Sequence, residues 1–346
     1  MKTNPVPSAL RALLLIAALL GRLWSPLQAA ADPFAINQRL GRGVNLGNAL
    51  DAPTEGEWGV VLKEEFFDAI KSAGFDSVRL PVRWSAHALK TAPYTIDAAW
   101  FARVDWALDQ ALKRGLPVVL DVHHYREVYA DPAPHRERFL ALWKQIAPHY
   151  KDYPDSLVFE LFNEPDEALT PDIWNEWLAA SLAIVRESNP HRTVVVGPGE
   201  DNIALYLADL RLPENDRNLI VTIHSYHPLS FTHQGAEWLS WADSKQWLGL
   251  TWTGTPAQLA NVNAEFDLAA AWGKRNHRPM NLGEFGSIKM ADMASRAAWT
   301  KALAEAAHSR GMSYHYWEFC ADFFGLYDQQ TKTFRQPLLD AVLPKK

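Results

Sequence analysis

Residues 157–165 read Leu-Val-Phe-Glu-Leu-Phe-Asn-Glu-Pro (LVFELFNEP), a short apolar run that ends in polar side chains. An apolar and aromatic run of this length, followed by Pro165, predicts a buried strand over Leu157–Glu164. Asn163 and Glu164 stand at its carboxyl end, where burial without partners would cost several kcal/mol for each side chain. The segment therefore predicts a core strand with polar partners or a site at its carboxyl end.

The same kind of run recurs along the whole chain. The other seven predicted strands are Gly43–Gly47, Ser77–Val82, Pro117–His124, Thr193–Pro198, Leu219–Tyr226, Met280–Phe285 and Met312–Phe319. Amphipathic patterns between the strands predict helices, the clearest over Leu62–Ala73, Ala98–Arg114, Arg136–Tyr150, Asp172–Ser188, Pro256–Arg275 and Met293–Arg310. Gly74, Gly115 and Gly311 stand where left-handed helix caps are needed. Alternating strands and helices favour parallel strands, and eight repeats favour closure. We predict an α/β fold, a single (β/α)8 TIM barrel over residues 32–346.

The N-terminal segment has the pattern of a signal peptide. Lys2 and Arg11 precede an apolar run over residues 12–20, which is too short to span a bilayer. A small-residue site follows, with cleavage expected after Ala31. We expect residues 1–31 to be removed and the mature protein to be secreted and free of the membrane; an uncleaved anchor is the alternative.

Composition narrows the classes of function. The net charge is −6, so nothing basic indicates a nucleic acid or an anionic membrane surface. The single cysteine, Cys320, excludes an intrachain disulfide. Fifteen Trp are enough for the core and for stacking on the apolar faces of sugar rings. We expect a monomer.

Polar side chains gather at the predicted carboxyl ends of seven strands. They are Asn45, Asn48, Arg79, His123, His124, Asn163, Glu164, His224, Tyr226, Glu284, Trp317 and Glu318. In a (β/α)8 barrel the active site lies at this end of the strands. The gathering therefore predicts a functional site there.

Two of these residues, Glu164 and Glu284, are suited to cleaving a glycosidic bond. They end the fourth and seventh predicted strands, which face each other across an eight-stranded barrel. Retaining glycosidases need an acid and a nucleophile about 5–5.5 Å apart. Arg79 is the natural partner of the ionised carboxylate, and Tyr226 is a candidate donor to it. Glu160 shares the face of Glu164 but lies one layer deeper, which indicates a structural carboxylate.

The motifs around these residues resemble those of glycoside hydrolase family 5. They are Asn163-Glu164-Pro165, Gly283-Glu284-Phe285-Gly286, Val78-Arg79-Leu80-Pro81-Val82, Asp121-Val122-His123-His124, His224-Ser225-Tyr226 and Tyr316-Trp317-Glu318-Phe319. A loop over Phe231–Trp238 is similar to one found in bacterial cellulases of the family. The resemblance runs from about Gly41 to Asp340, with the motifs in the family's chain order.

The resemblance implies roles for the catalytic residues. Glu164 would be the acid and base, and Glu284 the nucleophile that forms a glycosyl-enzyme ester. Asn163 would bond the sugar 2-hydroxyl. Arg79 and Tyr226 would hold Glu284 ionised, and His224 would orient Glu164.

It also implies the residues that bind substrate. His123 and His124 would bind sugar hydroxyls, and Trp317 would stack below the ring. His233 and Trp238 would contact further sugar units from the sixth loop. Asn45 is a candidate substrate contact or, equally, a side chain that satisfies backbone groups at the barrel end.

Several alternatives stay open. The loop over Phe231–Trp238 favours an endo-β-1,4-glucanase, but mannan, mixed-linkage glucan and xyloglucan remain possible substrates. A non-catalytic glycan-binding barrel would normally lack one carboxylate, and a transglycosylase would use the same residues. His224 and His227 point to opposite faces of a strand, so no zinc set follows, and we expect neither metal nor cofactor.

Overall fold

All eight predicted strands form and close into a parallel barrel. The computed structural model describes residues 32–344; the predicted signal peptide, residues 1–31, lies outside them. Each strand pairs with the next, and the last pairs with the first. The strands are β1 (Arg42–Asn45), β2 (Ser77–Leu80), β3 (Val118–Asp121), β4 (Leu157–Glu160), β5 (Val194–Val196), β6 (Leu219–His224), β7 (Met280–Glu284) and β8 (Ser313–Tyr316). The predicted (β/α)8 TIM barrel is confirmed.

The predicted strands were too long at their carboxyl ends. β4 ends at Glu160, four residues before Glu164, and β3 ends three residues before His124. Glu164 and His124 both have left-handed backbone conformations, with φ of +46° and +49°. A residue in that conformation cannot continue a strand, so these side chains leave the ladder and turn over the barrel mouth.

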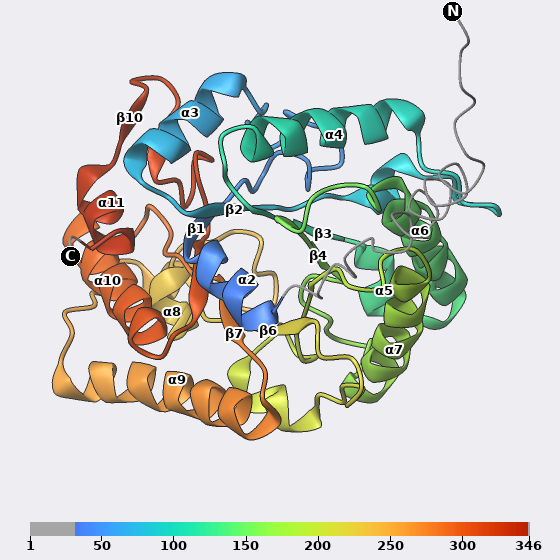
Figure 1. Cartoon of the computed structure of the whole chain (residues 1–346). Coiled ribbons are helices and arrows are strands. Elements are labelled where there is room, and N and C mark those ends of the chain that lie inside the picture. The colour runs from blue at the N-terminus through green and yellow to red at the C-terminus, as the bar shows by residue number, and fades with distance from the viewer. Residues whose placement is uncertain (1–31, 345–346) are drawn as a thin grey trace, which may run out of the picture.

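A ring of helices surrounds the barrel (Figure 1). The six predicted helices are α3 (Glu64–Ala73), α4 (Ala98–Leu112), α6 (Arg136–His149), α7 (Pro171–Ser188), α9 (Pro256–Asn276) and α10 (Met293–Ser309). The remaining helices are α2 (Pro33–Leu40), α5 (Arg126–Ala130), α8 (Leu229–Thr232) and α11 (Gln336–Val342), with 3-10 turns η1 (Trp84–His87), η2 (Ala133–His135), η3 (Ala204–Asp209) and η4 (Ser244–Trp247). The short strands β9 (Tyr327–Asp328) and β10 (Thr333–Phe334) pair after β8.

Gly74, Gly115 and Gly311 have left-handed backbone conformations, as predicted. Among residues 32–344, none of the helices combines the length and apolar character that crossing a membrane requires.

Buried tryptophans tie the ends of the strands to the surrounding elements. The indole N–H of Trp84 donates to the carbonyl of Asp121 at 2.9 Å, and that of Trp174 donates to the carbonyl of Gly197 at 2.9 Å. Both side chains are fully buried. Because the strands end here, these carbonyls have no ladder partner, and each indole supplies a donor as well as apolar area. Much of the tryptophan content therefore serves the core.

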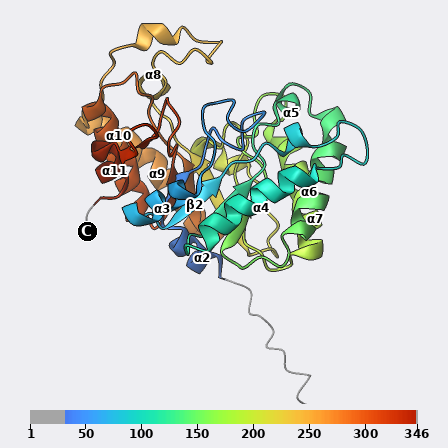
Figure 2. The ribbon, with the colours of Figure 1, turned by 90° about the horizontal axis from the view of Figure 1, so that it is seen from above.

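Helix α2, which the sequence patterns do not indicate, closes the end of the barrel opposite the site. It lies across the barrel centre in Figure 1, and in Figure 2 it lies at the end away from α5 and α8. Ile36 and Leu40 pack with four inward-facing strand side chains, namely Val119, Val158, Val195 and Ile220. Asn37 donates to the carbonyl of Met280 at 3.0 Å and accepts from Ser313 Oγ at 2.6 Å.

We expect Leu40→Ala to lower the free energy of unfolding by about 2–5 kcal/mol, because it leaves a cavity beneath the barrel core. Denaturant titration of the purified protein measures this loss. Phe34→Ala on the same helix is the matched control, since Phe34 is 45% exposed, and its loss should stay within about 0.5 kcal/mol. Equal losses in the two variants would contradict a sealing role for α2.

Candidate active site

A cleft of about 790 Å³ opens at the carboxyl ends of the strands. Glu164 and Glu284 both line it, together with side chains from the loops that follow the strands. Most of the predicted site lies here: the cleft also contains His123, His124, His224, Tyr226, His233, Trp238 and Trp317. The predicted position of the site is the position of the cleft.

The two glutamates approach each other across the barrel mouth, as predicted. Carboxylate oxygens of Glu164 and Glu284 lie within 4.8 Å of each other, with His224 between them. β6 and β7 are neighbours, and their register shifts at His224, which pairs with Glu284. A β-carbon on Gly283 would lie 2.7 Å from His224 Nε2, so only glycine leaves room for the imidazole. The carboxylate spacing is closer to the roughly 5–5.5 Å typical of retaining glycosidases than to the roughly 6.5–9.5 Å of inverting ones.

Arg79 lies fully buried beneath this pair and binds three carboxylates. Its Nε and one terminal nitrogen contact both oxygens of Glu160 at 2.7 and 2.8 Å. Its Nη1 contacts Glu284 Oε1 at 2.7 Å, and its Nη2 contacts Asp121 Oδ2 at 2.7 Å. The expected contact of Arg79 with the nucleophile candidate is present, and Glu160 lies in the deeper layer as predicted.

The charges around Arg79 do not cancel. Burial would lower the pKa of its guanidinium, but Glu160, Asp121 and Glu284 outweigh burial and raise that pKa well above the usual value. Burial also raises the pKa of Asp121 to about 6, against the attraction of Arg79. One cation therefore faces up to three anions, so the site favours uptake of a proton by one of its carboxyl groups.

Glu164 has the surroundings of a proton donor. Burial raises its pKa to about 7, although Arg79 and a hydrogen bond from Asn163 oppose that rise. Its Oε1 lies 2.7 Å from His224 Nδ1, and its Oε2 accepts from Asn163 Nδ2 at 3.2 Å. Burial lowers the pKa of His224, so the imidazole beside Glu164 is neutral at pH 7.

Glu284 has donors on both oxygens. Arg79 donates to Oε1, and the Tyr226 hydroxyl donates to Oε2 at 2.8 Å. Burial and the neighbouring charge of Glu164 raise the pKa of Glu284 to about 7, and Arg79 and the Tyr226 hydrogen bond act in the opposite direction. Because the two glutamates are close neighbours, they titrate as a pair. A guanidinium and a phenol favour the ionised form on Glu284, so the proton of the pair belongs to Glu164.

Aromatic rings and histidines form the floor of the cleft. Trp317 lies nearly parallel to His123, with ring centres 5.6 Å apart. A β-carbon on Gly47 would lie 2.8 Å from Trp317 Cη2, so the glycine lets the indole lie against the backbone. His123 Nδ1 contacts Asp121 Oδ2 at 2.8 Å, and burial lowers the pKa of His123 well below its usual value. Its Nε2 is therefore free to bond a ligand.

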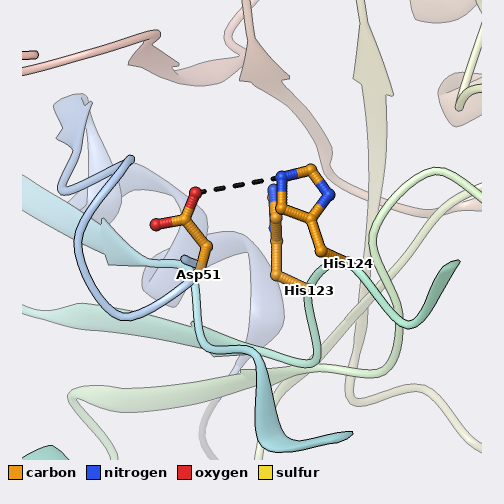
Figure 3. A group of neighbouring side chains, drawn as sticks. All are labelled: Asp51, His123 and His124. Carbon is orange, nitrogen blue, oxygen red and sulfur yellow. Dashed lines mark ion pairs between the residues drawn. The ribbon is translucent and has the colours of Figure 1, made fainter. Parts of the chain in front are cut away.

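Asp51 joins the two histidines at this edge of the cleft (Figure 3). Its Oδ2 lies 3.9 Å from His124 Nε2, and donor atoms of the three side chains lie within 4.8 Å of one another. Such a set can hold a cation. Asp51 also accepts backbone N–H bonds from Asn48 and Ala49, at 3.0 and 2.8 Å. These bonds give the carboxylate a structural role in the turn after β1.

The structure decides between the two roles expected for Asn45. It corrects the assignment as a substrate contact, because the side chain is fully buried below the cleft, and it supports the role of satisfying backbone groups. The Asn45 amide donates to the carbonyls of Gly283 and His315, both at 3.0 Å, and its oxygen accepts from Arg79 at 2.9 Å. Both amide hydrogens and the oxygen of Asn45 are hydrogen-bonded inside the barrel, so the side chain orders the strand ends instead of binding a ligand.

Asp121, which lies beneath the cleft, and Trp58 and Asp201, which line it, were not among the predicted site residues. Asp121 could have been found, because period two places it with His123 on one face of the third strand. Trp58 lines the cleft and meets the His124 ring edge-on, with centres 5.4 Å apart. Asp201 lies in a turn of left-handed residues and donates its backbone N–H to the carbonyl of Pro165 at 3.2 Å. No periodicity predicts the last two, because loops place them.

Comparisons with known proteins agree with this geometry. The sequence model of the family described as Cellulase (glycosyl hydrolase family 5) matches residues 41–323. Endoglucanase H of Acetivibrio thermocellus is 36% identical over 320 residues, which cover 90% of this chain and 34% of that protein. Endoglucanase B of Clostridium cellulovorans is 30% identical, covering 85% of this chain and 71% of that protein. The chain thus spans about a third of the length of the first of these relatives.

Solved structures are also similar, at a higher identity. Thermotoga maritima Cel5A in complex with cellobiose is 49% identical, with a TM-score of 0.87 over 90% of this chain and all of that one. The same protein in complex with mannotriose gives the same identity, coverage and TM-score.

We expect Arg79→Met to lower the free energy of unfolding by about 3–5 kcal/mol at pH 7, because it leaves buried carboxylates without a cation. The folded-state pKa of these carboxyls then lies above the unfolded value, so the folded variant gains stability as it takes up protons. The loss should therefore shrink as the pH falls from 7 toward 5. Denaturant titration at both pH values measures it.

Arg42→Met is the matched control for this prediction. Arg42 pairs with Asp76 at 2.9 Å, but both side chains are partly exposed. The substitution should therefore lower the free energy of unfolding by less than about 1 kcal/mol. Two results would contradict the role of Arg79 in neutralising buried carboxylates. One is a loss of unfolding free energy in Arg79→Met no larger than in Arg42→Met, and the other is a loss that grows toward pH 5.

Proposed function

Because the chain belongs to the cellulase family, glycosyl hydrolase family 5, we propose that it is a retaining endo-β-1,4-glucanase. One observation supports the mechanism: the carboxyl group of Glu284 is buried, that of Glu164 is partly exposed, their oxygens lie within 4.8 Å of each other, and their partners differ. Glu284 contacts a guanidinium and a phenol, whereas Glu164 contacts a neutral imidazole and an amide. This asymmetry separates a nucleophile from an acid.

The reaction follows in two displacements. Glu284 attacks the anomeric carbon, the bond to the leaving oxygen breaks, and Glu164 gives its proton to that oxygen. An ester then joins the sugar to Glu284. Glu164, now ionised, takes a proton from water, whose oxygen attacks the same carbon and releases Glu284. Both glutamates end as they began.

His224 can support Glu164 in both protonation states. Neutral imidazole carries one proton on either ring nitrogen. With the proton on Nε2, Nδ1 accepts from protonated Glu164; with the proton on Nδ1, it donates to ionised Glu164. The 2.7 Å contact thus persists while Glu164 changes from acid to base.

The substrate follows from the cleft and from the relatives. Trp317, the two histidines that follow β3 and the loop with His233 and Trp238 offer aromatic faces and hydroxyl-binding groups. The relatives are endoglucanases, and a similar structure holds cellobiose. The same protein has also been solved in complex with mannotriose, which favours mannan as a second substrate of this chain.

Product release from purified residues 32–346 tests the activity. We expect soluble sugars to be released from carboxymethylcellulose and barley β-glucan. Release from glucomannan measures whether the cleft also accepts mannose units. Glu284→Gln should reduce release about 10⁴-fold or more, with an unchanged unfolding transition. No release from any of the three polymers would refute the endoglucanase proposal. Full activity in Glu284→Gln would refute its role as nucleophile.

Glu164→Ala tests the retaining step in the same assay. We expect it to form the glycosyl-enzyme from an aryl cellobioside with a good leaving group, which needs no acid. Added azide should then restore turnover and give a β-glycosyl azide, because a small anion can replace the base-activated water. An α-glycosyl azide, or no effect of azide, would contradict the double displacement.

The pH profile should depend on Tyr226. Activity needs Glu284 ionised and Glu164 protonated, so kcat/KM should fall above about pH 7 as Glu164 loses its proton. Tyr226→Phe removes a donor that stabilises ionised Glu284, so the pKa of Glu284 rises. The acidic limb of kcat/KM should move up by about one pH unit. An unmoved or lowered limb would show that Tyr226 does not stabilise the charge.

A further inference from the structure

The segment that follows β6 places one buried serine between the two side chains that distinguish the glutamates. His224 contacts Glu164, and Tyr226 donates to Glu284. Because successive side chains of an extended segment alternate in direction, Ser225 points the opposite way, out of the barrel and toward the surrounding helices. Whatever holds Ser225 on that side therefore acts on both of its neighbours.

Ser225 is held by a carboxyl group from the helix layer. Its Oγ donates to Glu265 Oε2 at 3.0 Å, and its backbone N–H donates to the carbonyl of Glu284 at 3.0 Å. Glu265 belongs to α9, which lies in the outer ring of helices (Figure 1). A side chain outside the barrel thus reaches the catalytic segment directly behind the contacts that its other face makes in the cleft.

Glu265 occupies a position that is costly for a carboxyl group. Its Oε1 is closed to solvent and has no hydrogen-bond partner among residues 32–344. Burial raises the pKa of Glu265 to about 7, against the hydrogen bond from Ser225. An apolar side chain of similar size would avoid the cost of the unpartnered oxygen. A residue that breaks a local rule of stability in this way is typical of a functional position.

The bond to α9 constrains the segment differently from the other bonds that hold it. The backbone N–H of His224 donates to the carbonyl of Asn202 at 3.0 Å, and the Trp299 indole donates to the carbonyl of His227 at 3.1 Å. These two bonds hold backbone groups at the ends of the segment. The bond of Ser225 holds a side chain in the middle, so it opposes rotation of the segment about its own axis.

We propose that Glu265 is a positioning residue of the catalytic centre: through Ser225 it fixes the rotation of the segment after β6, and with it the contacts of His224 and Tyr226 with the two glutamates. The proposal rests on the proposed endoglucanase function and deepens it by adding a residue that lies outside the cleft. An ionised and a protonated carboxyl group can each accept from Ser225, so the hold persists on both sides of neutral pH.

Glu265→Leu removes the acceptor and leaves Ser225 free to turn. We expect kcat on barley β-glucan to fall about three- to tenfold, because small displacements of catalytic groups are costly. The acidic limb of kcat/KM should move up by about half a pH unit, since a displaced Tyr226 donates less well to Glu284. The urea midpoint of unfolding should stay the same or rise, because the unpartnered oxygen is gone. A lower midpoint with unchanged kcat and pH limb would show a merely structural role.

Two further variants test whether Glu265 acts through Ser225. Ser225→Ala should lower kcat by a similar factor, and the double variant Glu265→Leu/Ser225→Ala should be no slower than either single one. Glu265→Gln should keep kcat near that of the unmodified protein, because its amide oxygen can still accept from Ser225. Losses that multiply in the double variant would overturn the proposed route through Ser225.

Asp267→Leu is the matched control on the same helix. Asp267 pairs with Arg310 at 2.8 Å, but its side chain is 70% exposed, so kcat and the pH limb should not change. Values in Glu265→Leu equal to those in Asp267→Leu would overturn the positioning role and leave the endoglucanase intact. No cleavage of β-glucan by the unmodified protein would instead overturn the proposed function, and the role of Glu265 with it.

Discussion

The buried guanidinium of Arg79 is the interaction on which the rest of the site depends. It joins β2 to carboxylates from β3, β4 and β7, all within 2.8 Å. Removing these charges from water is costly, and only close and simultaneous contacts offset that cost. The contacts form only when the barrel has closed with its strands in register. Closure of the fold and placement of Glu284 are therefore one event.

The difference between the two glutamates arises largely from one strand. His224 and Tyr226, two residues apart at the end of β6, point the same way and reach Glu164 and Glu284 respectively. A neutral ring beside one carboxyl and a hydroxyl donor beside the other make their proton affinities unequal. Gly283 on the next strand leaves the space for this arrangement. The unequal proton affinities of the two glutamates thus follow from alternation along a strand and one missing β-carbon.

Periodicity along the chain predicts what the barrel itself determines. The eight strands and the site at their carboxyl ends follow from alternation and closure, whereas the contact of Arg79 with Glu284 was implied by the family resemblance; the structure has all three. Strand ends do not follow, because left-handed residues such as Glu164 stop the ladder and carry no apolar signal. Asn45 shows a second limit: an amide near a barrel mouth can serve a ligand or the backbone. Its depth, which sequence does not give, decides between them.

The positions of the loop side chains in the cleft could not be predicted from the sequence, because no periodicity determines them. Trp58, Asp201 and Trp241 reach the cleft through turns and hydrogen bonds between distant loop positions, with no period to follow. The Arg79 network needs every partner in place, so its residues cannot change singly without leaving a buried charge unpaired. An exposed rim residue such as Trp241 contacts mainly solvent, so a change there costs the core little. The barrel therefore fixes the positions of the two glutamates, while the side chains of the rim are free to vary.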